Sequence, residues 1–250
     1  MGTGRSLGIL MGTLFVAAGA ASAAIVTVNG TDVIFLAGRT DVTLAPAGTP
    51  PVGYPLVRLS PPGAYAETFP EEMAASTGEQ FQFSASGIVS YVAGGDFFGP
   101  DGSTAPAVGT SSINSLAGIS GYLGPCGALA GVFLNGTDPE SEIAPLPLDF
   151  AGAGDTSFTV LAPSLNQVFF IGDGLTGTGA ETTQSFITPV GATRLFLGVP
   201  DGLYFNGAPG AYDDNSGAFT VAVTSTVVPE PSSVGLLAIG SLILCHHRRR

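Results

Sequence analysis

Short apolar runs separated by Gly, Pro, Asn and Asp fill the chain from residue 25 onward. Phe219, Val221 and Val223 alternate with small or polar residues, the two-residue period of a half-buried strand. Similar patterns predict strands at 25–28, 33–36, 56–59, 80–84, 88–92, 129–134, 157–161, 168–171, 186–188, 193–197 and 219–223. About eleven short strands separated by turn residues predict one all-β domain, a jelly roll or β-sandwich.

Few segments carry helical periodicity. The sequence favours short helices only at 71–76 and 110–119, the second with Ser111 and Ser112 as capping candidates. The Pro-rich stretch 45–62 is expected to be a long loop rather than a domain boundary, because the residues before it are too few to fold alone. We therefore expect a single β domain at 25–226, between terminal segments 1–24 and 227–250.

A loop rich in oxygen-bearing side chains joins the apolar run Leu195–Phe196–Leu197 to the alternating run at 219–223. Calcium takes ~6 to 8 oxygen ligands from carboxylates, amides, carbonyls and water, which such a loop can supply. A solvated Asp/Asn/Gly turn is the alternative interpretation. The candidate side chains are Asp201, Asn206, Asp213, Asp214, Asn215 and Ser216.

The charge balance favours a cation as partner. The formal net charge is −12, and all 7 basic residues are arginines, four of them in the terminal segments. Nucleic-acid binding needs clustered positive charge, so we expect no nucleic-acid partner. Divalent cations suit the acidic body better.

The body lacks the residues that most catalytic sites require. Both histidines, His246 and His247, lie in the C-terminal tail and no lysine occurs, which excludes triad, Schiff-base and most zinc chemistry. Cys126 is the only cysteine before the tail, so no internal disulfide is expected. We predict that the protein is not an enzyme; a glycosidase built on two carboxylates is the catalytic alternative.

The N-terminal segment 1–24 has the three parts of a secretory signal peptide. Arg5 precedes an apolar run from residue 7 to 18, and Ala21-Ser22-Ala23 provides small residues for cleavage after residue 23 or 24. We therefore expect an exported protein.

The C-terminal segment 227–250 combines a Pro-Glu-Pro triplet, an apolar stretch and an arginine cluster. The apolar stretch at 234–245 would extend only ~18 Å as a helix, against a hydrocarbon core of ~30 Å. The order of parts resembles the PEP-CTERM sorting signal. That resemblance implies handling by a membrane exosortase and the secretion machinery, membrane contact through a short hydrophobic helix, and release or attachment at the cell surface. The residues that carry it are Pro229, Glu230, Pro231, Arg248, Arg249 and Arg250.

Four motifs in the body, in this order, resemble the bacterial calcium-dependent galactose-binding (galactophilic) lectin family, whose fold is a small jelly roll. They are Phe98-Gly99-Pro100-Asp101-Gly102, Cys126-Gly127-Ala128-Leu129, the run Gly-Ala-Thr-Arg-Leu-Phe-Leu-Gly at 191–198, and Tyr212 through Asn215-Ser216-Gly217 to Phe219. The resemblance spans about residues 80–223, with extra residues after Asp201 and between Ala130 and Gln184.

The resemblance implies a calcium site with three side-chain ligands and backbone carbonyls. The matching side chains are Asp201, Asp214 and Asn215, and the matching carbonyls are those of Tyr91 and of Ala211 or Tyr212. Because residues 202–210 are inserted, a second alignment places Gly207 where the first places Asp201. The sequence leaves both alignments open.

The family's sugar-contacting His and Gln have no counterpart in residues 103–125, so galactose specificity does not carry over. A sugar would instead bind through vicinal hydroxyls on calcium, with Asp201, Asp214 and Asn215 beside it. We therefore predict an exported cell-surface or matrix protein that binds a surface or matrix polysaccharide. A structural surface protein that binds no ligand is the alternative.

Overall fold

The computed structural model describes residues 21–49, 53–103, 109–177 and 179–227, and it confirms an all-β fold. The helices in these residues are four short 3-10 turns, η1 (Ile34–Leu36), η2 (Pro139–Ser141), η3 (Leu203–Phe205) and η4 (Tyr212–Asp214). The strands are β1 (Ala21–Asn29), β2 (Glu71–Ala74), β3 (Glu79–Ser90), β4 (Phe97–Phe98), β5 (Thr110–Ile113), β6 (Tyr122–Pro125), β7 (Ala130–Leu134), β8 (Val160–Leu161), β9 (Val168–Phe170), β10 (Ser185–Ile187), β11 (Arg194–Gly198), β12 (Asn206–Gly207) and β13 (Ser216–Val227).

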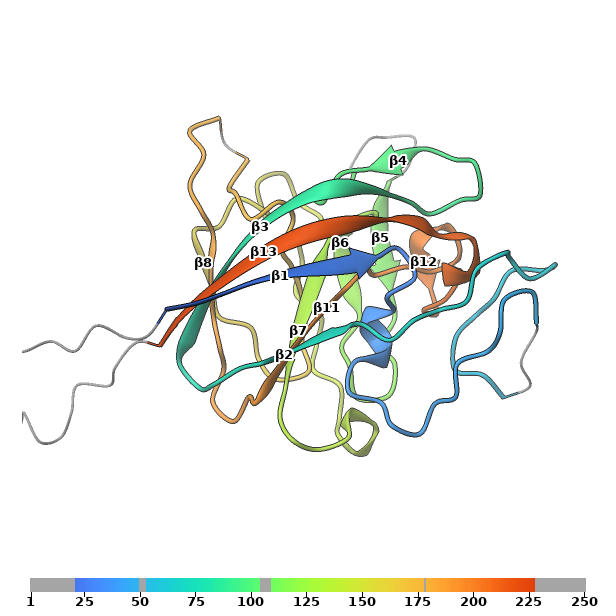
Figure 1. The fold of residues 1–250 in the computed structure, drawn as a ribbon, viewed down its shortest axis with the longest axis horizontal. Helices are drawn as coiled ribbons and strands as arrows, with labels where there is room; N and C mark the ends of the chain where they lie inside the picture. The colour runs from blue at the N-terminus through green and yellow to red at the C-terminus, as the bar shows by residue number, and fades with distance from the viewer. Residues whose placement is uncertain (1–20, 50–52, 104–108, 178, 228–250) are drawn as a thin grey trace, which may run out of the picture. The chain divides into compact units, whose positions relative to one another are not determined.

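The strands form three sheets. The largest is six-stranded with the order β1-β13-β3-β10-β8, and β4 pairs with β3. Its long strands β1, β13 and β3 run side by side (Figure 1). A four-stranded sheet has the order β2-β11-β7-β9, and a small sheet has the order β12-β5-β6.

Phenylalanine rings fill the space between the two larger sheets. Phe81 of β3 lies 5.9 Å from Phe133 of β7, and Phe169 of β9 lies 5.3 Å from Phe186 of β10, measured between ring centroids. All four rings are almost fully buried. Burial of large aromatic side chains on facing sheets is the main stabilisation of such a core.

The longest strands follow the alternation that the sequence predicts. Along β13, Phe219, Val221 and Val223 are buried while the residues between them face outward. β13 pairs with β1 on one side and β3 on the other over nearly its whole length. The single strand β3 replaces the two that the sequence predicts at 80–84 and 88–92.

Two predictions for the first third of the chain are wrong. The expected strand at 33–36 is the 3-10 turn η1. Its three residues are fully buried, so the sequence shows no alternation of apolar and polar positions that could distinguish a turn from a strand. The expected helix at 71–76 is β2, which pairs with β11 in antiparallel register. Pairing with a distant strand outweighs the local helical preference there.

Two further segments differ from expectation. Residues 110–119 are not helical: β5 occupies 110–113 and pairs with β6, so Ser111 and Ser112 lie in a strand rather than at a cap. Residues 56–59 make only an isolated bridge between Val57 and Gly210. β5 is held by its hairpin partner β6 and Val57 by a segment far along the chain, and the pattern within either segment alone does not reveal the pairing.

The terminal segments lie mostly outside the described residues. Residues 21–24 of the predicted signal peptide belong to β1, so cleavage after residue 23 or 24 would leave a shorter first strand. Among the described residues no helix is long and apolar enough to cross a membrane. The predicted hydrophobic helix at 234–245 is not among them.

Candidate functional site

Strand pairing brings several loops to one end of the largest sheet. Ser216 at the start of β13 pairs with Ser90 at the end of β3, and Ala218 pairs with Asn29 at the end of β1. The residues that follow β1 and β3 therefore lie beside those that precede β13. Val199, just after β11, joins this end through a bridge to Val33.

Asn215 and Asp201 meet at this end, although 14 positions separate them. The Asn215 amide nitrogen donates to Asp201 Oδ2 at 2.9 Å and to the Gly30 carbonyl at 2.8 Å. Because a backbone carbonyl can only accept, these bonds fix which end of the amide is nitrogen. The Asn215 side-chain oxygen is consequently left buried without a partner.

Asp214 lies next to this pair, at a cavity of about 600 Å³. Asp214 is only 8% exposed, and its Oδ1 is also buried without a hydrogen-bond partner. Asp201 and Asp214 both line the cavity. Buried polar atoms without partners are costly and rare, and here two occur on adjacent residues.

Burial governs the electrostatics of both carboxyl groups. Loss of water contact raises the pKa of Asp201 well above its ordinary value of 3.8, and the nearby charges of Asp214 and Asp213 raise it further. The hydrogen bonds from Asn215 and the Gly202 N–H lower it only in part. Burial likewise raises the pKa of Asp214. Both carboxyl groups line one cavity, and carboxyl groups that share a site favour a proton or a cation between them.

Two tyrosines support the site through their hydroxyl groups. Tyr212, fully buried, accepts a hydrogen bond from the Asp201 N–H at 2.9 Å and donates one to the Val199 carbonyl at 2.8 Å. Tyr91 lines the cavity and donates to the Gly127 carbonyl at 2.8 Å. The Tyr212 carbonyl already accepts a bond from the Asn215 N–H, whereas Ala211 lines the cavity. Of the two residues whose carbonyls the sequence left open, Ala211 is the one that lines the cavity.

Asp213 joins the long loop at 45–62 to the site. Its two carboxylate oxygens accept from the Leu59 and Gly63 N–H groups, at 3.3 and 2.6 Å. A Cβ on Gly63 would lie 1.9 Å from the Asp213 carbonyl oxygen, so only glycine allows this approach. The same loop carries Arg58, which forms a buried ion pair with Glu67.

The inserted segment 202–210 contains strained backbone. Tyr204 and Phe205 both have left-handed φ, 55° and 54°. For bulky residues this conformation costs of order 1–3 kcal/mol each and concentrates at functional sites. Phe205 packs against Tyr91 and Phe98, with ring centroids 5.5 and 6.5 Å apart, and these three rings form one wall of the cavity.

The structure thus brings together Asp201, Asp214 and Asn215, with Tyr91 and Ala211 at the same cavity. Gly207 lies in β12, which pairs with β5, and it does not line this cavity. Asn206 is also in β12, and Asp213 is occupied with backbone donors. The sequence missed the Gly30 carbonyl and the Leu-Tyr-Phe run of the insertion; aromatic residues between glycines in an acidic loop were the available signal.

The donor set of this site suits a hard divalent cation. Two carboxylates would balance its charge, and the free oxygens of Asp214 and Asn215 would each gain a bond. Ligation by these oxygens would replace the missing hydrogen bonds. Calcium therefore fits the residues present, with Asp201, Asp214 and Asn215 as candidate side-chain ligands and the carbonyls of the cavity-lining residues Tyr91 and Ala211 as further candidates.

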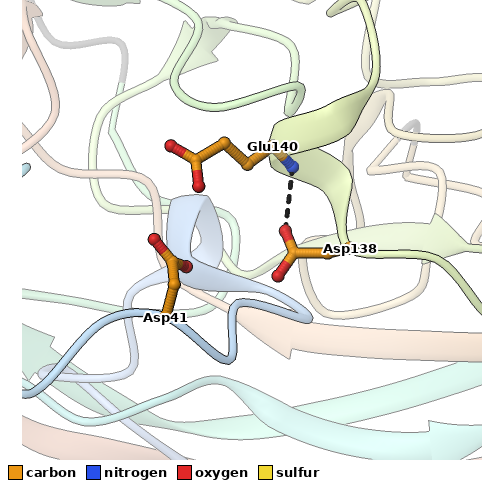
Figure 2. A group of neighbouring side chains, drawn as sticks. All are labelled: Asp41, Asp138 and Glu140. Carbon is orange, nitrogen blue, oxygen red and sulfur yellow. Dashed lines mark hydrogen bonds between the residues drawn. The ribbon is translucent and has the colours of Figure 1, made fainter.

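A second acidic group lies elsewhere, formed by Asp41, Asp138 and Glu140 (Figure 2). In the described part of the chain it is the only set of three His, Cys, Asp or Glu side chains whose ligand atoms lie within 4.8 Å of one another. Arg39 donates to both oxygens of Asp41 at 2.6 Å and lies 3.4 Å from Glu140. Its hydrogen bonds lower the pKa of Asp41 to about 2. This guanidinium already supplies the positive charge that an ion would bring.

The predicted sorting residues, from Pro229 to Arg250, fall outside the described part of the chain. A scan of known family models finds none that matches the chain, and a search of curated proteins finds none similar to it.

Proposed function

We propose that this is an exported protein whose β domain, a jelly roll of the lectin-like kind, binds carbohydrate through calcium. The observation that carries the proposal is the pair of buried, unpartnered oxygens on Asp214 and Asn215, beside the Asp201 carboxylate. An amide and two carboxylates on a rigid sheet end provide charge and ligands for calcium.

The adjoining cavity supports the carbohydrate part of the proposal. Its volume of about 600 Å³ lies within the range of small-molecule sites, and it combines aromatic walls with a carboxylate floor. Calcium keeps coordination positions that adjacent sugar hydroxyls can fill in place of water. Asp201 and Asp214 would then accept hydrogen bonds from the same hydroxyls.

Thermal unfolding of the purified protein with calcium or with chelator tests the metal step. A ligand at 100 times its Kd stabilises the folded state by about 2.7 kcal/mol, which raises the Tm of a domain this size by roughly 5–10 °C. Asp214→Asn should abolish most of this rise, because it removes one of two charges without changing shape.

The matched control changes the other acidic group. Asp138→Asn/Glu140→Gln keeps the side-chain shapes, and asparagine still caps η2. This variant should keep the full calcium response. A response lost in the control but kept in Asp214→Asn would place the ion at Asp41, Asp138 and Glu140 and refute the proposed site.

A glycan array, read with calcium and with chelator, tests the sugar step. Signals that appear only with calcium support the proposal. If calcium raises the Tm and no glycan binds, the result supports the alternative of a structural surface protein. The lack of His and Gln at 103–125 also favours that alternative. Turnover of a chromogenic glycoside would instead revive the two-carboxylate glycosidase.

Export and sorting form a separate part of the proposal. Mass spectrometry of protein recovered from the cell surface or medium reads both ends of the mature chain. We expect a new N-terminus at residue 24 or 25 and a C-terminus near the Pro229-Glu230-Pro231 triplet. Recovery of the intact chain from the cytoplasm would refute this part alone.

A further inference from the structure

The inserted segment 202–210 forms a closed loop beside the cavity. The Gly210 N–H donates to the Asp201 carbonyl at 3.1 Å, and Gly202 forms a bridge with Pro209. Its strand β12 also pairs in parallel with β5. The conformation of the loop is therefore set by backbone hydrogen bonds at its base and along its length.

Within this loop, adjacent aromatic side chains have different environments. Phe205 packs against Tyr91 and Phe98, whereas Tyr204 is 89% exposed and yet lines the cavity. Both residues have the left-handed backbone described above. Because Phe205 anchors the segment, Tyr204 is positioned at the mouth of the cavity.

Exposing this ring does not stabilise the free protein. An aromatic side chain gains most from burial, and left-handed backbone adds a cost that glycine would avoid. Val92 and Leu203, 58% and 41% exposed, line the same cavity, so an apolar mouth lies above the acidic floor. A ligand that fits both must have an apolar face and several hydroxyl groups, as the ring of a pyranose sugar has.

We propose that Tyr204 is the platform on which a pyranose ring stacks while its hydroxyls reach the calcium-binding floor at Asp201 and Asp214. This inference rests on the function proposed above and names the residue that selects the sugar. The exposed carboxylate of Asp96, which lines the same cavity, provides a further acceptor for a sugar hydroxyl.

A single substitution gives a direct probe of stacking. The chain contains no tryptophan, so Tyr204→Trp keeps an aromatic platform and creates the only indole in the protein. Methyl glycosides of glucose, galactose and mannose are titrated in calcium and then in chelator. At least one should shift the emission of Tyr204→Trp in calcium only. Val190→Trp, at a position 82% exposed and outside the cavity lining, should not respond.

Tyr204→Gly separates binding from folding. Glycine adopts the left-handed conformation readily, so the Tm and its rise with calcium should equal or exceed those of the wild type. Affinity for the responding glycoside should fall about tenfold, or about 1.4 kcal/mol.

Three outcomes would overturn the inference. Unchanged glycoside affinity in Tyr204→Gly removes the platform but leaves calcium-dependent sugar binding intact. Failure of the wild type to bind any of the three glycosides in calcium overturns the platform together with the proposed sugar binding. An emission shift with choline that does not depend on calcium would show that an organic cation occupies the aromatic mouth instead.

Discussion

Substitution of Tyr212 by phenylalanine tests how the site is held together. The hydroxyl group of Tyr212 is fully buried and bonds both the Asp201 N–H and the Val199 carbonyl. Phenylalanine leaves the shape of the ring unchanged and removes both bonds. The Val199 carbonyl keeps its bond from the Ile34 N–H at 3.4 Å, so the Asp201 N–H is the group left without its partner.

The expected cost follows from that one group. A buried donor that loses its partner costs ~1–3 kcal/mol, so we expect Tyr212→Phe to lower the free energy of unfolding by about 2 kcal/mol. In a domain of this size the Tm would fall by roughly 4–8 °C. Because the Asp201 backbone loses its support, the calcium-induced rise in Tm should shrink as well.

Tyr122→Phe is the matched control. Its hydroxyl is equally buried but makes one longer bond, to the Pro125 carbonyl at 3.2 Å, and Tyr122 does not line the candidate cavity. Urea unfolding with calcium and with chelator measures both variants. A Tyr212→Phe variant that is no less stable than Tyr122→Phe, or an equal calcium response in both variants, would contradict this role of the Tyr212 hydroxyl.

Three further predictions concern the groups around the site. In chelator, the Tm should fall as pH rises above about 4. The folded-state pKa of Asp201 is raised above its ordinary value of 3.8, so its stabilisation is complete below 3.8 and is lost as pH passes the folded-state pKa. In a Tm–pH series, Asp201→Asn should flatten this slope. Arg58→Met should lower the free energy of unfolding in urea by about 3–5 kcal/mol, since the Glu67 side chain is 0% exposed and would keep an unpaired charge. The double variant Arg58→Met/Glu67→Leu should recover much of this stability. Gly63→Ala should lower the free energy of unfolding by roughly 1–3 kcal/mol, because its Cβ would displace Asp213. It should also weaken calcium binding in calorimetric titration. An unchanged titration would show that the Gly63–Asp213 contact does not support the calcium site.

The parts of the fold that the sequence predicts are those with one face buried. β13 and β3 carry the two-residue period because each presents one side to the core. The turn η1 has no exposed side, and β2 depends on its distant partner β11. The local pattern of apolar and polar residues reveals neither burial on all sides nor pairing with a distant strand.

For the candidate site too, the sequence predicts local position but not long-range contacts. Asp214 and Asn215 directly precede a strongly patterned strand, so their position at a strand end was predictable. Whether Asp201 or Gly207 lies beside Asp214 and Asn215 depends on the inserted residues 202–210. They can form a separate loop after Asp201, or they can displace Asp201 so that Gly207 takes its position. The bond from the Gly210 N–H to the Asp201 carbonyl closes the insertion on itself, which leaves Asp201 just after the end of β11. The direction of Tyr204 depends on a left-handed backbone that nothing in a Leu-Tyr-Phe run indicates.

β13 has a consequence for how the protein would be displayed on a surface. Asn215 precedes its first residue, and the chain leaves its last residue, Val227, toward the predicted sorting tail. Twelve residues of extended strand cover about 40 Å at ~3.3 Å per residue. The residues that precede β13 at the cavity and the residue from which the chain continues toward the predicted tail therefore lie at opposite ends of one strand, so a modification or attachment C-terminal to Val227 would join the domain at the end opposite the cavity.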